Sequence, residues 1–152
     1  MIGYLIWILL RMIDRKKDLV KLQHGEYISY GKIESTLKTS PLVENICIYA
    51  DPRKTYCVAI IIPSILALAN MSSQEPDQAI NQKDVHINFA QSLESYGLAM
   101  GLIRVECPKI VMLTLDNWTP ENGLVTAALK LRRHFIYKKY QDELTNLYLD
   151  SE

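Results

Sequence analysis

The chain has 152 residues, of which 49% are hydrophobic and 22% are charged, a composition that fits one folded domain and excludes a disordered chain. Seventeen basic residues balance seventeen acidic ones, so there is no overall positive field to recruit nucleic acid or an anionic membrane. Any anion-binding site must therefore be local, built by a few residues that the fold brings together.

The first residues form a strongly apolar run over Ile2–Leu10, which Arg11 interrupts. A membrane-spanning helix needs about 20 apolar residues, so this run is too short to be one. It also lacks the basic start and the small-residue cleavage site of a secretory signal. We interpret residues 1–10 as an atypical leader, either foreign to the rest of the chain or part of a buried strand over Leu5–Ile13.

A short strand and a helix are predicted next. Asp18–Gln23 has the pattern of a strand, and Gly25 is predicted to form the turn that follows it. Ser29 is predicted to cap a helix whose Ile33 and Leu37 share one face.

Two strands are predicted next, over Val43–Ala50 and Tyr56–Ile62, because both runs are rich in β-branched and aromatic residues. The turn formers of residues 51–54 join them, as in two neighbouring strands of one sheet. Ser64 then begins a short predicted helix. The polar segment Ser72–Lys83 is predicted to be a loop.

The last elements are a helix near Val85–Val105, a strand over Lys109–Leu115, a loop over residues 119–123 and a terminal helix. The terminal helix is predicted from Ile136, Tyr140, Leu144 and Leu147, which recur at helical spacing, with Arg132, Arg133, Lys138 and Lys139 on its other faces. These elements predict an α+β fold, with one small sheet of about three strands packed with helices, preceded by a short β segment.

The cysteines and histidines are not spaced as a metal site or a disulfide framework. Cys47, Cys57 and Cys107 are predicted to be reduced core residues, as in a reducing compartment. The three histidines, His24, His86 and His134, are interpreted as surface polar groups. We predict no metal ligands and no nucleic-acid partner.

Two segments could carry chemistry. The first has four cations within seven residues, namely Arg15, Lys16, Lys17 and Lys21, followed by a glycine turn at which a backbone can approach a ligand closely. The second is a loop of turn formers that leads to Lys130, a lysine that could reach into a site and offset charge on a phosphoryl group. From spacing alone, each could equally be a solvated basic segment.

Taken together, the two segments resemble the adenylate-forming acyl-CoA synthetases, particularly the eukaryotic long-chain fatty-acid branch. The run IDRKKDLVKLQHGEYIS is similar to that family's hinge motif, and WTPENGLVTAALKLRR resembles its terminal catalytic-lysine motif. Between them, SYGKIESTLKTSPLVENICIYA and a strand ending in IIP are also similar. The resemblance runs from about Leu10 to about Tyr148. It implies that residues 11–152 form the family's C-terminal lid domain, with the hinge at 14–18.

The resemblance also implies roles for single residues. Lys130 would be the catalytic lysine, Lys17 the hinge and Arg15 a contact to the nucleotide. The rearranged site next to CoA or the adenylate would be lined by Lys21, Gly25 and Glu26. Arg133 stands where the family's closing arginine follows its lysine by three residues, and Leu129 stands where many relatives have glycine.

The reaction that the resemblance implies joins a long-chain fatty acid to CoA at the expense of ATP, releasing AMP and pyrophosphate. Its partner would be the large N-terminal domain, which carries the ATP and fatty-acid sites and Mg²⁺. The six glycines form no phosphate-binding loop, so this chain alone is expected to be an inactive fragment. The resemblance implies a cytoplasm-facing enzyme, held at the endoplasmic reticulum membrane through the large domain, with no transmembrane segment in this chain.

Two other functions stay open at this point. A lid domain made alone could bind CoA or nucleotide weakly, or dock on an intact synthetase without catalysing anything. Alternatively, the apolar residues 1–10 could attach a small protein to a membrane surface.

Overall fold

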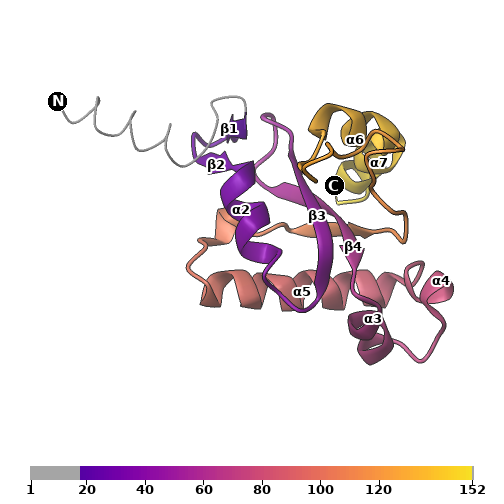
Figure 1. Ribbon diagram of the computed structural model, residues 1–152. Helices are drawn as coiled ribbons and strands as arrows, with labels where there is room; N and C mark the ends of the chain where they lie inside the picture. Colours follow the sequence, from indigo (N-terminus) through magenta and orange to yellow (C-terminus); the bar gives the residue numbers. More distant parts are fainter. Residues whose placement is uncertain (1–17, 152) are drawn as a thin grey trace.

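The computed structural model describes residues 18–151. The leader, the strand predicted over Leu5–Ile13 and residues 14–17 of the predicted hinge lie outside the described residues. The described chain is built on a three-stranded sheet with helices on both faces, and a small two-stranded sheet precedes it (Figure 1). The predicted α+β fold with a small sheet is confirmed.

The sheet has the strand order β3-β4-β5, with β3 over Val43–Ala50, β4 over Cys57–Pro63 and β5 over Ile110–Leu113. β3 runs antiparallel to β4, whereas β5 runs parallel to it. Every residue of β4 is buried, as expected of a central strand that is covered on both faces. The three strands predicted here are confirmed to within one or two residues at their ends.

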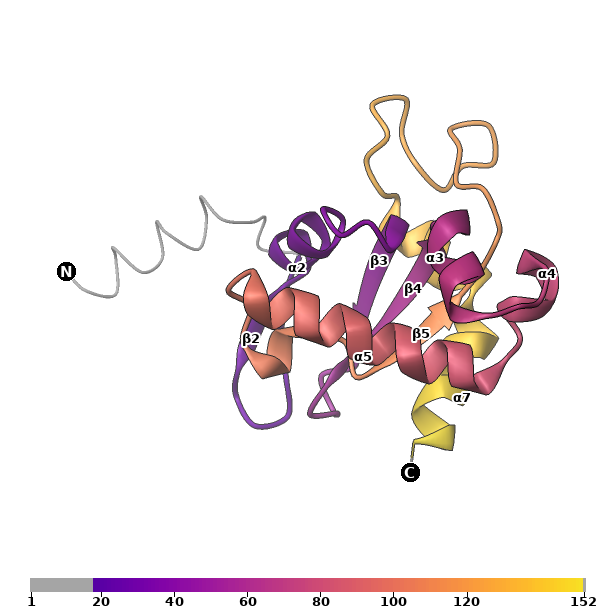
Figure 2. The ribbon, with the colours of Figure 1, turned by 90° about the horizontal axis from the view of Figure 1, so that it is seen from below.

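The two faces of β4 enter two separate hydrophobic clusters. Cys57, Ala59 and Ile61 pack against α2 (Tyr30–Leu37) and α5 (Lys83–Ala99), while the alternate residues of β4 pack against α6 (Arg133–Lys139) and α7 (Gln141–Asp150). Figure 2 shows α5 in front of the strands and α7 behind them. The alternation follows from the period of two residues in a β-strand.

The segment before α2 is a hairpin of β1 (Leu19–Lys21) and β2 (Tyr27–Ser29), which pair antiparallel. Gly25 adopts a φ of +93° in the connecting turn, a conformation that glycine adopts without steric cost. Ser29 ends β2 and caps α2, since its hydroxyl accepts a hydrogen bond of 3.1 Å from the backbone N–H of Lys32. The predicted turn and cap are confirmed, whereas β2 was not predicted.

The connection between β4 and β5 differs in part from the prediction. Helix α3 (Ile65–Met71) has the predicted cap, because the Ser64 hydroxyl accepts from the Ala67 N–H at 3.0 Å. The segment predicted as a loop contains the short helix α4 (Pro76–Ala79), with proline in its first turn, where no backbone donor is needed. The predicted long helix is α5, which ends at Ala99 before Gly101, whose φ is +99°. A 3₁₀ turn, η2 (Arg104–Glu106), follows.

The terminal helix is two helices, and this corrects the prediction of one. Tyr140 separates α6 from α7 with φ −105° and ψ 23°. Its hydroxyl accepts a hydrogen bond of 3.1 Å from the Trp118 indole and donates one of 2.8 Å to Asp116. Ile136, Tyr140 and Leu144 still share one buried face, as the spacing predicts.

The three cysteines are free and buried, as predicted. Burial raises the pKa of each thiol, that of Cys57 to about 12, so none is a nucleophile near neutral pH. His86 is half-buried, and its two ring nitrogens lie within hydrogen-bond distance of the carbonyl oxygens of Ile80 and Val111. It therefore ties α5 to β5, which corrects its interpretation as a surface group. No helix of residues 18–151 is both long and apolar enough to cross a membrane.

The packing of α5 on the sheet predicts that two of its residues contribute very differently to the free energy of unfolding. Phe89 is fully buried, whereas Ile87, two residues earlier, is 45% exposed. Phe89→Ala should lower the free energy of unfolding by about 3–5 kcal/mol. Ile87→Ala should lower it by no more than about 1 kcal/mol. Urea unfolding of both variants measures the contrast, and equal losses would contradict the placement of α5.

Candidate active-site groove

The loop between β5 and α6 is fixed at its base. Trp118 is buried near the start of the loop, and Leu124 and Val125 are buried further along it. Thr119 and Asn122 bond each other's backbone, because the Thr119 N–H donates to Asn122 Oδ1 at 3.1 Å and the Asn122 N–H donates to Thr119 Oγ1 at 3.2 Å. The loop projects from the sheet, at the top of Figure 2, on an ordered base.

The tip of the loop is a tight turn over residues 126–130. Val125 and Leu131 form an antiparallel bridge below the turn. Thr126 then closes it, since its N–H donates to the carbonyl of Lys130 at 2.8 Å and its hydroxyl accepts from the N–H of Lys130 at 3.1 Å. Leu129 adopts a φ of +62°, the left-handed region that side chains with a Cβ rarely occupy. This turn places Lys130 at the surface.

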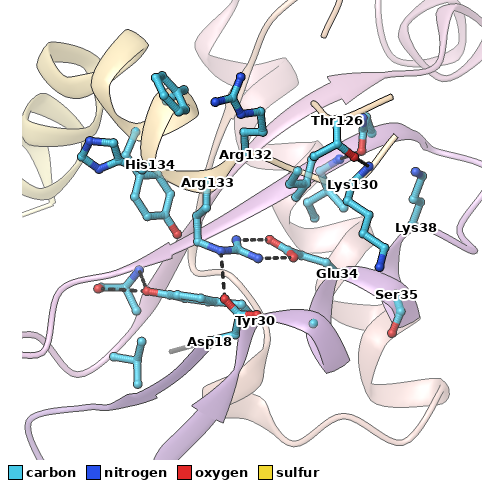
Figure 3. A pocket seen from close by; sticks show the side chains of 18 of the residues that line it. Asp18, Tyr30, Glu34, Ser35, Lys38, Thr126, Lys130, Arg132, Arg133 and His134 are labelled. Carbon is cyan, nitrogen blue, oxygen red and sulfur yellow. Dashed lines mark hydrogen bonds and ion pairs between the residues drawn. The ribbon is translucent and has the colours of Figure 1, made fainter. Parts of the chain in front are cut away.

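Lys130 borders an open groove of about 1290 Å³ between the turn, α2 and β3. Figure 3 shows its side chain extending from the turn towards Ser35 and Lys38 of the α2 region. Within residues 18–151, neither Lys130 nor Lys38 pairs with a carboxylate. The guanidinium of Arg132, also on the groove, lies over the Phe135 ring at 4.1 Å from its centroid. The chain has no net charge, yet Lys38, Lys130 and Arg132 line this groove without a carboxylate partner among residues 18–151.

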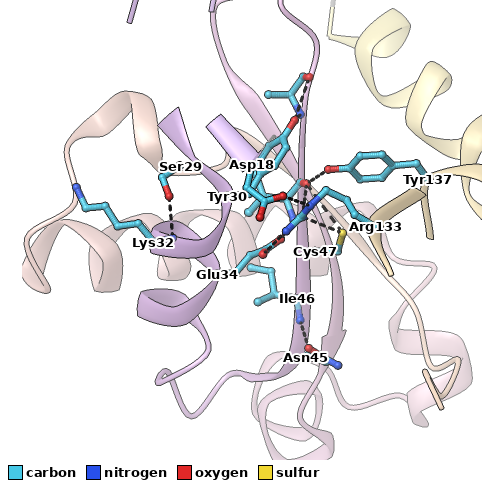
Figure 4. Close-up of polar contacts among 12 residues, drawn as sticks. Asp18, Ser29, Tyr30, Lys32, Glu34, Asn45, Ile46, Cys47, Arg133 and Tyr137 are labelled. Atoms are coloured by element: carbon cyan, nitrogen blue, oxygen red, sulfur yellow. Dashed lines mark hydrogen bonds and ion pairs between the residues drawn. The ribbon is translucent and has the colours of Figure 1, made fainter. Parts of the chain in front are cut away.

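The charge of Arg133, by contrast, is compensated inside the domain. Its Nη1 and Nη2 donate to the two carboxylate oxygens of Glu34 at 2.6 and 2.8 Å, and its Nε lies 3.7 Å from Asp18. Its guanidinium also lies over the Tyr30 ring, 4.5 Å from the centroid (Figure 4). Burial alone lowers the pKa of Arg133, but the hydrogen bonds and charge of Glu34 raise it above its ordinary value. The guanidinium therefore stays charged.

The outer edge of β3, opposite the edge that pairs with β4, is covered by four side chains: those of Tyr30, Glu34, Arg133 and Tyr137. The Ile48 N–H donates to Glu34 at 2.7 Å, and the Ile48 carbonyl accepts from Arg133 at 3.4 Å and from the Tyr137 hydroxyl. The Ala50 N–H donates to the Tyr30 hydroxyl at 3.2 Å. An edge strand with unpaired backbone groups is open to pairing with another chain, so these contacts protect it.

The buried groups beside the groove are unsuited to proton transfer near neutral pH. Burial raises the pKa of the Tyr30 and Tyr137 hydroxyls, and it raises that of the Cys47 thiol well above its usual range. All three stay protonated. What the groove offers chemically is therefore a mobile ammonium group at Lys130, suited to holding an anion.

The residues predicted from the sequence are not all brought together. Lys130 lines the groove, whereas Lys21, Gly25 and Glu26 lie on the β1–β2 hairpin and do not line it. Lys21 is exposed, with its ammonium 5.8 Å from the centroid of the Tyr27 ring. Arg15 and Lys17 lie outside the described residues.

Sequence reasoning missed the partner of Arg133. Glu34 is 8% exposed and shares the inner face of α2 with Tyr30, Ile33 and Leu37. A carboxylate at a buried helical position needs a cationic partner, so its place in the helical period was a usable signal. Among residues 18–151 there is no group of three or more His, Cys, Asp or Glu side chains that could hold a metal ion.

The ion pair predicts that mutations of Arg133 and Glu34 have non-additive effects on the free energy of unfolding. The side chains of Arg133 and Glu34 are only 19% and 11% exposed, so Arg133→Met should lower the free energy of unfolding by about 3–5 kcal/mol by leaving a buried carboxylate unpaired. Adding Glu34→Leu should recover part of that loss, as a double-mutant cycle in urea would measure. The control is Arg104→Met, which breaks the pair with Glu94 at a side chain 81% exposed, and which should cost no more than about 1 kcal/mol. Additive losses at Arg133 and Glu34 would contradict the coupling.

Comparison with known proteins places the chain among long-chain acyl-CoA synthetases. No family model matches it. It is 46% identical over 145 residues to long chain acyl-CoA synthetase 8 of Arabidopsis thaliana, across 91% of this chain and 20% of the relative. It is 39% identical over 150 residues to long-chain-fatty-acid–CoA ligase 1 of Schizosaccharomyces pombe, across 93% of this chain and 22% of that one. The chain thus spans about a fifth of the length of these curated relatives.

Solved structures share the fold. The A domain of carboxylic acid reductase from Segniliparus rugosus, in complex with AMP and a co-purified carboxylic acid, superposes with a TM-score of 0.81 at 29% identity, over 92% of this chain and 21% of that one. A fatty acyl CoA synthetase of Mycobacterium tuberculosis has the same fold, with a TM-score of 0.56 at 19% identity over 86% of this chain and 21% of that one. The described part of the chain therefore has the fold of the C-terminal region of adenylate-forming enzymes, and the chain belongs to the family of long-chain acyl-CoA synthetases.

Proposed function

We propose that this chain serves as the swinging lid of a long-chain fatty-acid–CoA ligase and supplies its catalytic lysine, Lys130. The observation that carries the proposal is the contrast in the groove between Arg133, whose charge is satisfied within the domain, and Lys130, whose charge is not. An unpaired ammonium on an ordered turn is available to an anion from outside the domain. In the complete ligase, that anion is the reacting fatty acid and the α-phosphate of ATP.

The reaction has two steps. In the first, an oxygen of the fatty-acid carboxylate attacks the α-phosphorus of ATP, and pyrophosphate leaves. Negative charge concentrates on the phosphoryl oxygens during this step, and Lys130 stabilises it. In the second step the CoA sulfur, having lost its proton, attacks the acyl carbon, and AMP leaves with the bonding electrons of the acyl–oxygen bond. No phosphorus bond changes in that step, so Lys130 contributes little to it.

Two faces of the lid serve the two steps. Lys130 projects from the loop before α6, while Lys21, Gly25 and Glu26 lie on the β1–β2 hairpin and do not line the groove. A lid that turns about Lys17 can present the lysine loop first and the hairpin turn second. Gly25 suits the second role, because a turn without a side chain lets backbone approach CoA closely. Arg15 is proposed to contact the ribose or phosphates of the nucleotide.

The chain is proposed to need the large domain of a synthetase for activity. Its groove is open to solvent, and catalysis by positioning requires that all the reacting groups be held in a fixed geometry. The large domain would hold ATP, Mg²⁺ and the fatty acid, and would keep the enzyme at the endoplasmic reticulum membrane with this lid facing the cytoplasm. The chain alone, given all three substrates, should form no acyl-CoA.

Tests of single residues therefore use a chimeric synthetase, in which this chain replaces the matching segment of the Arabidopsis relative. The unmodified chimera should form acyl-CoA from ATP, CoA and a long-chain fatty acid. An inactive chimera, beside an active parent enzyme, would contradict the proposed function.

Lys130→Ala in the chimera should slow adenylate formation about 100- to 1,000-fold, because charge at the α-phosphate is then unopposed. Fatty-acid-dependent exchange of pyrophosphate into ATP measures this step. Transfer of the acyl group to CoA from supplied acyl-adenylate should stay within several-fold of the unmodified chimera. Lys138→Ala is the control, since Lys138 is exposed and does not line the groove. Equal losses in both steps would show that Lys130 is structural.

Lys17→Pro in the chimera should separate the two steps in another way. Proline fixes φ near −65° and removes a backbone donor, so a hinge residue replaced by proline cannot make the rotation. If the lid is trapped in the adenylate-forming arrangement, a single turnover should still release pyrophosphate, while transfer to CoA falls by orders of magnitude. Lys17→Ala removes the charge and leaves the backbone free to turn, so it should keep both steps. An alanine variant as defective as the proline variant would show that the ammonium group, and not the hinge, matters.

A further inference from the structure

Leu129 has a backbone conformation that its residue type does not favour. Among residues 18–151 it is the one residue other than glycine with a positive φ, at +62°. In that region the Cβ of an L residue approaches the carbonyl oxygen that follows, and glycine avoids this contact. The hydrogen bonds of Thr126 impose the turn, since the Leu129 N–H donates to the Thr126 carbonyl at 2.8 Å. A glycine would make the same turn without strain.

Within residues 18–151, the side chain of Leu129 has little packing that would offset this strain. It is 67% exposed, and it belongs to neither of the two hydrophobic clusters on the sheet. Strained non-glycine residues persist where the surrounding structure holds them, and they cluster at active sites and ligand clamps. The side chain of Leu129 therefore points to a benefit that arises outside residues 18–151.

The place of Leu129 indicates what that benefit is. Leu129 and Lys130 are adjacent, and both line the same groove. The groove has both cationic and apolar lining, because Leu131 and Phe135 line it beside Lys38 and Lys130. A ligand that matches this surface carries an anion next to an apolar group, as a fatty acyl group joined to a phosphate does. When Lys130 reaches such a ligand, its neighbour in the turn necessarily comes with it.

We propose that Leu129 excludes water from the acyl-adenylate while Lys130 is inserted, an inference that rests on the proposed function. The reaction to be prevented is hydrolysis. A water oxygen attacks the acyl carbon, and the bond from that carbon to the phosphate oxygen breaks with its electrons staying on the phosphate. The products are AMP as its dianion and the fatty-acid carboxylate, and the two protons of the water pass to solvent. An apolar group beside the mixed anhydride removes the attacking water, and it strengthens the attraction between Lys130 and the phosphate by lowering the local dielectric.

The test compares three variants of the chimeric synthetase, and it measures how much AMP is released for each acyl-CoA formed. Leu129→Gly removes the side chain and relieves the turn, Leu129→Ala removes the side chain and keeps a Cβ in the strained turn, and Leu129→Met keeps an apolar side chain of similar volume. The glycine and alanine variants should release several-fold more AMP per acyl-CoA than the unmodified chimera. The methionine variant should match the unmodified chimera.

Several outcomes would overturn the inference. Excess AMP release from the glycine variant alone would show that rigidity of the turn matters, and not the side chain. Tight coupling in both the glycine and the alanine variants would show that the side chain excludes no water. Failure of the proposed function is seen separately, as adenylate formation that survives Lys130→Ala.

The isolated 152-residue chain gives an independent measurement. Leu129→Gly should leave the midpoint of thermal unfolding unchanged or raise it, because a strained conformation is relieved and no packing is lost. A midpoint lowered by several degrees would show that the side chain stabilises this domain, and it would remove the reason for seeking its role elsewhere.

Discussion

The pairing of Arg133 with Glu34 is the interaction on which the candidate site depends. The two residues are 99 positions apart, and their hydrogen bonds fasten the first residue of α6 to α2. The loop that carries Lys130 ends one residue before α6, so this ion pair fixes where the loop returns to the sheet. The same guanidinium reaches Asp18, where the described chain begins. The planar fork of arginine allows one cation to hold several acceptors, which the point charge of a lysine would do poorly.

The sheet explains why the groove lies where it does. β4 is covered on both faces, so helices from early and late parts of the chain must pack on opposite sides of it. β3 is an edge strand, and α2 and α6 meet beyond its open edge. The side chains that pair Arg133 with Glu34 also satisfy the backbone of Ile48 on that edge. The buried pair of Arg133 and Glu34 thus has two roles: it protects the edge of β3, and it supports the loop that carries Lys130.

The sequence predicted the elements that depend on local pattern, and it failed where contacts distant in the chain decide. The strands β3 and β4, the Ser29 cap and the Gly25 turn all follow from neighbouring residues. The break between α6 and α7 does not, because Tyr140 is held by Trp118 and Asp116, more than twenty residues earlier.

Within the site, Lys130 was found by resemblance to a motif, and the structure adds the groove around it. Glu34 was overlooked because a carboxylate in a helix is most often solvated, although its place on the apolar face of α2 was a signal of burial. The conformation of Leu129 is likewise invisible in sequence, since leucine is not among the residue types that favour the left-handed region. Glycine at 129 would make the same turn without strain, and the leucine there packs into neither hydrophobic cluster of the described chain. That strain, next to a lysine with no carboxylate partner among residues 18–151, is the physical reason to look for the partner of this turn outside the domain.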